Sequence, residues 1–159
     1  MRRRRGLLAV IAVALIAVGV LVGNVIAQSS APTAVRQPLA QSTVVKGAKG
    51  RTLGLARVVI PPGATIALHH HQGTQAAYIQ AGVLTYTVKS GSVTVMSGPA
   101  DKAQVVRKVN AGQTAKIPAG DWIVEQPTTI HTATNAGKVK IVIYLSTLLK
   151  TGAPPSTPN

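Results

Sequence analysis

The sequence predicts an all-β domain, and three observations support this fold class. Runs rich in β-branched residues alternate with Gly and Pro, no stretch shows a convincing 3.6-residue apolar period, and turn signals follow one another at short spacing. Alternation is clearest in VLTYTVK at residues 83–89, where Leu84, Tyr86 and Val88 are expected to face a core. Together these features favour a β-sandwich or a β-barrel.

Strands are expected wherever such a run lies between turn residues. The expected strands are residues 52–60, 64–70, 75–80, 83–89, 92–97, 104–109, 113–117, 121–126, 129–134 and 138–146. The turns between them include the tripeptides PPG, QAG, PAG and two copies of NAG. Because the chain has no Phe, Val, Ile, Leu and Ala must form the core, and Tyr78 and Tyr86 are expected to line it, with Tyr86 facing the pocket.

The first 27 residues predict an N-terminal helix that directs export. Four arginines precede an uncharged apolar run from Leu7 to Val22, and small residues suited to a signal peptidase follow at Val25 and Ala27. The run is also close to the roughly 20 residues that span a bilayer. Two interpretations therefore stand, a cleaved signal peptide or a retained membrane anchor, and both place the folded domain outside the cytoplasm as a secreted or membrane-anchored protein.

Both flanks of the predicted domain are poor in large apolar residues. Residues 28–43 and 151–159 consist mainly of Ser, Thr, Pro, Ala, Gln and Gly, so burial cannot offset the entropy of ordering them. We expect a disordered linker at 28–43, a folded domain at 44–150 and a disordered tail at 151–159.

The chain is strongly basic and contains no cysteine. Its formal net charge is +14, and without the four leader arginines thirteen basic residues still face three acidic ones. This charge predicts attraction to an anionic membrane or cell-wall surface. Nucleic acid is not an expected partner, because the sequence has no basic helical stripe and only four aromatic residues. Without thiolates, any metal must be held by imidazole, oxygen or amide groups.

Three consecutive histidines carry the main chemical signal. His69 and His71 are two positions apart on an expected strand, so both point to one face, whereas His70 points to the other. Imidazole is the commonest metal ligand in proteins. The spacing of His69 and His71 allows a shared ion, and the alternative is that each imidazole is simply packed or solvated.

Two longer patterns surround these histidines. The first consists of Gly63, His69, His71, Gln75 and Gly82, and the second of Gly112, Pro118, Gly120, His131 and Asn135. In order and spacing they resemble the two motifs of the cupin superfamily, in its small, single-domain, quercetin dioxygenase-like type. The resemblance covers about residues 52 to 146. It departs from the strict pattern at Gln75, where the family has glutamate, and in a longer stretch between Gly120 and His131.

The resemblance implies a jelly-roll barrel, also called a double-stranded β-helix, with a metal near its wider mouth. His69, His71 and His131 would be the imidazole ligands, and the amide oxygen of Gln75 would replace the carboxylate. The ion would be divalent, with iron, manganese, zinc, nickel and copper all open. Losing one negative charge weakens the hold on the metal and favours an anionic ligand at an open position.

Glu125 is the candidate catalytic residue. It lies in the second motif, where it could act as a base at the open site or hydrogen-bond a ligating imidazole. The alternative is a surface partner for one of the many basic groups.

Two classes of function follow from these residues. One is an enzyme, a metal-dependent oxidoreductase of dioxygenase type or an isomerase using Lewis-acid chemistry, that acts on a small molecule. The other is a binding module that holds a sugar, a wall fragment or a small metabolite without turnover; a metal-sequestering or adhesive protein is a third hypothesis. An exposed edge strand would favour a homodimer.

Overall fold

The structure is a computed structural model that describes residues 31–159. The predicted signal peptide or anchor at 1–27 lies outside the described residues. The strands are β1 (Val35–Ser42), β2 (Arg51–Ile60), β3 (Thr65–His70), β4 (Gly73–Ala81), β5 (Val83–Ser90), β6 (Ser92–Ser97), β7 (Gln104–Asn110), β8 (Thr114–Pro118), β9 (Asp121–Glu125), β10 (Ile130–Thr134), β11 (Ile141–Lys150) and β12 (Thr157–Pro158). A 3-10 helix, η1, covers Ala100–Lys102. None of the helices in this described part is long and apolar enough to cross a membrane.

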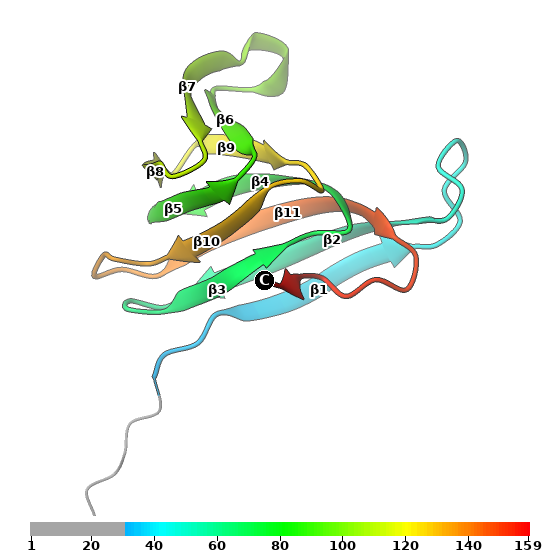
Figure 1. The fold of residues 1–159 in the computed structure, drawn as a ribbon, viewed down its shortest axis with the longest axis horizontal. Coiled ribbons are helices and arrows are strands. Elements are labelled where there is room, and N and C mark those ends of the chain that lie inside the picture. The colour runs from blue at the N-terminus through cyan, green and yellow to red at the C-terminus, as the bar shows by residue number, and fades with distance from the viewer. Residues whose placement is uncertain (1–30) are drawn as a thin grey trace, which may run out of the picture.

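Two antiparallel sheets form the jelly roll. The larger has the order β1-β2-β11-β4-β9-β6-β7 and the smaller the order β12-β3-β10-β5-β8. Figure 1 shows β3, β10 and β5 lying across β2, β11 and β4. Every strand predicted between residues 52 and 146 is present, with ends shifted by at most four residues. The all-β prediction is therefore confirmed.

The core lies between the sheets, where the strands alternate as predicted. Leu84, Tyr86 and Val88 on β5 are all buried, and Ile79, Ile117 and Ile123 of facing and neighbouring strands are fully buried. The prediction for Tyr78 is wrong, since its side chain is 42% exposed. Buried residues of β4 occupy odd positions, so the even position 78 points outward.

The linker prediction for residues 28–43 is wrong for 35–42, which form β1. This strand pairs with β2 along its length and closes the edge of the larger sheet. Its side chains are mostly exposed, so backbone hydrogen bonds to β2, rather than an apolar face, hold it in place. Because neither face of this edge strand is fully buried, its sequence shows little alternation of apolar and polar residues.

The tail prediction for residues 151–159 also differs from the structure. Thr157 and Pro158 form β12, which pairs with His70 and His69 of β3, and the backbone N–H of Asn159 donates to the carbonyl of Leu68 at 3.1 Å. Figure 1 shows the C-terminus lying beside β3. The folded unit is thus larger at both ends than the predicted 44–150. The expected homodimer through edge strands remains a prediction.

Candidate metal centre

The site is formed by two cross-strand pairs on facing sheets. His69 of β3 is paired with His131 of β10 in the smaller sheet, and Gln75 of β4 is paired with Glu125 of β9 in the larger one. His71 lies in the connection between β3 and β4, one residue beyond the end of β3. This connection links the two sheets. It therefore places His71 between the His69–His131 pair and the Gln75–Glu125 pair.

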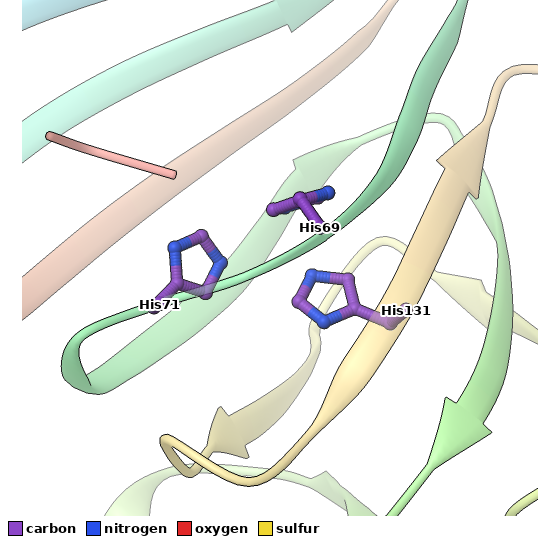
Figure 2. A group of neighbouring side chains, drawn as sticks. All are labelled: His69, His71 and His131. Carbon is purple, nitrogen blue, oxygen red and sulfur yellow. The ribbon is translucent and has the colours of Figure 1, made fainter. Parts of the chain in front are cut away.

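The three histidines converge as the sequence predicts. Figure 2 shows His69 and His71 coming from one segment and His131 from another, with the three rings close to one another. Their ring centroids lie 4.2 to 5.3 Å apart, and each ring offers one nitrogen within 4.8 Å of the others. All three are buried. His70 is outside the cluster, and its Nδ1 lies 2.8 Å from Nδ2 of Asn159.

Backbone carbonyls orient the imidazoles from behind. Nδ1 of His69 lies 2.7 Å from the carbonyl of Ala67, and Nδ1 of His71 lies 2.7 Å from that of Pro155. Nδ1 of His131 faces the carbonyl of Thr129 at the longer distance of 3.3 Å. A carbonyl only accepts, so the hydrogen-bond network assigns the hydrogen to Nδ1 of His69 and His71 and leaves the lone pair on Nε2. This arrangement is typical of histidines that bind metals.

Glu125 is buried beside His71 and His131, so the surface alternative is wrong. Oε1 lies 3.0 Å from Nε2 of His131 and accepts a hydrogen bond from the hydroxyl of Tyr86 at 2.8 Å. Oε2 lies 3.6 Å from Nε2 of His71 and accepts a hydrogen bond from the amide of Gln75. The 3.0 Å between Oε1 of Glu125 and Nε2 of His131 is hydrogen-bond distance when Nε2 carries the hydrogen.

The nitrogen of the Gln75 amide, rather than the predicted oxygen, faces the cluster. Its nitrogen donates to Nε2 of His71 at 2.9 Å and to Glu125. Its oxygen is buried and has no hydrogen-bond partner among the described residues. Turning the amide around would place that oxygen against the carboxylate of Glu125 and the lone pair of His71, so the network favours the observed orientation. Gln75 is therefore a donor in this structure.

Burial sets the charge states of the site. It lowers the pKa of His69, His71 and His131, an effect that the carboxylate of Glu125 opposes only in part. Burial alone would raise the pKa of Glu125, but its electrostatic interactions with His131 and His71 and the hydrogen bonds from Gln75 and Tyr86 lower it overall. Neutral imidazoles and an ionised carboxylate are the forms that bind metals.

The cluster lies at the wall of a cavity of about 240 Å³. Most of its lining is apolar, including Val58, Leu84 and Ile143, and Arg36 of β1 also lines it. Burial lowers the pKa of Arg36, and no carboxylate of the described residues lies within ion-pair distance of it. Arg36 and Pro155 are not among the predicted site residues, because both lie in segments expected to be disordered.

The residues present suit a divalent metal ion. Three buried imidazoles, two of them with Nε2 free of hydrogen, and an adjacent carboxylate form a donor set that zinc, iron, manganese, nickel or copper accepts. The fold and the histidine cluster together define the class of protein, a jelly-roll β-barrel with a candidate metal site.

Comparison with known families agrees with this class. The sequence model of the family described as Cupin matches residues 26–153. The chain therefore belongs to the cupin family, as its two motifs predict. No curated protein matches the chain in sequence.

Solved structures are similar to this chain at low sequence identity. A cupin 2 domain-containing protein from Halorhodospira halophila is 14% identical, with a TM-score of 0.52 and coverage of 84% of this chain and 75% of that one. A cupin superfamily protein from Desulfitobacterium hafniense is 16% identical, with a TM-score of 0.48 and coverage of 73% and 77%. The DMSP lyase DddQ from Ruegeria pomeroyi is 11% identical, with a TM-score of 0.49 and coverage of 67% of this chain. The chain spans only 43% of that lyase.

Proposed function

We propose that this cupin binds a divalent metal ion through His69, His71 and His131 and presents it to a small anionic molecule. One observation carries the proposal. The three imidazoles converge in a buried cluster, with Nδ1 of each facing a backbone carbonyl, so that Nε2 is directed to a common centre. Packing alone does not readily stabilise three buried imidazoles in this arrangement, whereas a bound metal ion would.

Arg36 supports an anionic ligand. Its half-buried guanidinium lines the cavity and has no carboxylate partner in the described part of the chain. A guanidinium matches a carboxylate with two parallel hydrogen bonds, and the apolar walls suit the hydrocarbon part of such a ligand. When bound, the metal would supply Lewis-acid or oxygen chemistry, as in an oxidoreductase of dioxygenase type or an isomerase.

A non-catalytic binding module is the second candidate, and one observation favours it. Glu125 is the sole carboxylate lining the cavity among the described residues, and both its oxygens already accept hydrogen bonds. Few groups therefore remain to move a proton. Loading the chain with iron and offering small carboxylates and sugars separates the two candidates, because oxygen consumption or product indicates an enzyme, whereas saturable binding without product indicates a binding module.

Metal analysis of the full chain, purified without a polyhistidine tag, tests the metal site itself. We expect close to one divalent ion per chain, or saturation near that ratio when the metal-free chain is titrated with Zn²⁺. A chain that neither retains nor takes up a divalent ion would refute the proposal.

We also propose that the domain acts outside the cytoplasm, at an anionic membrane or wall surface. Asp121 and Glu125 are buried, so Asp101 is the one exposed acidic residue among the thirteen basic residues of the described part. The surface field is thus almost purely cationic. Binding to vesicles containing phosphatidylserine should weaken as salt rises from about 0.01 to 0.5 M. Absence of binding at low salt would contradict this partner.

A further inference from the structure

We infer that Glu125 supplies the carboxylate ligand of the metal centre, and that Gln75 and Tyr86 position it. This inference rests on the proposed metal site. The carboxylate would then come from Glu125 on β9, whereas the glutamate of the family motif corresponds to position 75 on β4.

The register of the larger sheet explains how the ligand can change strand. Gln75 and Glu125 are directly opposed across β4 and β9, and both are buried. Side chains of opposed residues in a sheet project from the same face, with Cβ atoms about 5 Å apart. A carboxylate on either strand therefore reaches the same end of the barrel.

Distances support direct contact between the carboxylate and the ion. Two ligand atoms bound to one ion lie roughly 3 to 3.5 Å apart, given bonds of about 2.1 Å. Oε1 of Glu125 lies 3.0 Å from Nε2 of His131, and Oε2 lies 3.6 Å from Nε2 of His71. The carboxylate is thus already at ligand spacing from two of the three imidazoles.

The neighbouring donors leave the carboxylate free to bind. Tyr86 donates to Oε1 and Gln75 donates to Oε2, so each oxygen accepts one hydrogen bond and keeps capacity for a second contact. These donors also fix the carboxyl group in one orientation, as groups behind metal ligands do. Gln75 is better suited to this task than glutamate, because a second carboxylate would repel Glu125.

Zinc titration of the metal-free, untagged full chain tests the assignment. We expect Glu125→Gln to lower Zn²⁺ affinity by more than tenfold, and Gln75→Ala, which removes a positioning group, to lower it less. His70→Ala, outside the cluster, serves as the matched control and should change affinity less than twofold. If Gln75→Ala loses more affinity than Glu125→Gln, or if Glu125→Gln binds like the unaltered chain, the inference is wrong while the histidine site stands.

A crystal structure of the unaltered chain with Zn²⁺ gives a readout that does not depend on variant folding. We expect a Glu125 oxygen at about 2.0–2.2 Å from the ion. An ion bound by the three histidines with the Glu125 oxygens beyond about 3 Å would overturn the assignment. A chain that takes up no Zn²⁺ at all would overturn both this assignment and the proposed function.

Discussion

Gln75 and Glu125 face each other across β4 and β9, and the amide of Gln75 donates a hydrogen bond to the carboxylate of Glu125. The site therefore contains a carboxylate even though the first motif lacks one. Its negative charge lies 3.0 Å from His131 and 3.6 Å from His71. The loss of charge expected from Gln75 alone is thus compensated from the neighbouring strand.

Changing individual histidines should separate the metal site from a simple chelating run. His71→Ala or His131→Ala should lower Zn²⁺ affinity at least tenfold, since even groups behind ligands have effects of that size. His70→Ala should leave it nearly unchanged, because His70 lies outside the cluster and contacts Asn159. Titration of the three metal-free variants gives the comparison. Equal losses for His70→Ala and His71→Ala would indicate an unstructured run.

Stability of the metal-free chain should fall as the pH falls below about 6.5. Burial lowers the pKa of His69, His71 and His131 in the folded state, so the unfolded state binds more protons below the ordinary pKa of imidazole. Each histidine then reduces the free energy of unfolding by up to about 1.4 kcal/mol per pH unit until its folded pKa is reached. Below about pH 4.3, Glu125 acts in the same direction, because its folded pKa is also lowered.

Urea unfolding between pH 8 and 5, in the presence of a chelator, measures how the free energy of unfolding changes with pH. His131→Gln should make this change smaller, and His70→Ala should leave it as it is. A free energy of unfolding that does not change over this range would contradict the buried, neutral state of the imidazoles.

Replacement of Gly73 should destabilise the strand that carries Gln75. A Cβ atom at this position would lie 2.2 Å from the carbonyl oxygen of Leu148 on β11. Backbone must move to accept it, so Gly73→Ala should cost about 3 kcal/mol of unfolding free energy. Gly112→Ala is the comparison, since its Cβ would meet no atom within 4 Å and its φ of +82° alone costs about 1–2 kcal/mol. Equal losses in thermal or urea unfolding would contradict the close approach of β4 and β11.

Arg36 should select for negative charge in the cavity. Arg36→Met keeps the length of the side chain and removes the charge, so affinity for a small carboxylate such as butyrate should fall about tenfold, as for a lost charge-assisted hydrogen bond of ~1.5 kcal/mol. Binding of the matching amide should hardly change. Arg57→Met, on β2 and outside the cavity lining, is the control. If Arg36→Met and Arg57→Met affect butyrate equally, general surface charge rather than Arg36 attracts the ligand.

Local pattern was enough to predict the strands and the histidine cluster. Alternation on β5 correctly assigned Leu84, Tyr86 and Val88 to the core, because side chains of a strand point alternately to its two faces. Parity correctly separated His70 from His69 and His71, and the ordered motifs placed His131 with them.

Pairing between distant strands determined the features of the site that local sequence pattern did not predict. The position of Glu125 opposite Gln75 depends on the register of β4 against β9, which no local period encodes. β1 and β12 pair through their backbones, so their polar sequences carried no signal, yet they bring Arg36 to the cavity and the carbonyl of Pro155 to His71. The sequence alone therefore determined the fold class and the three histidines of the candidate metal site. Only the tertiary structure decided that the carboxylate of Glu125 and the guanidinium of Arg36 lie at the same cavity as the histidines, because strand register and edge pairing are set between distant parts of the chain.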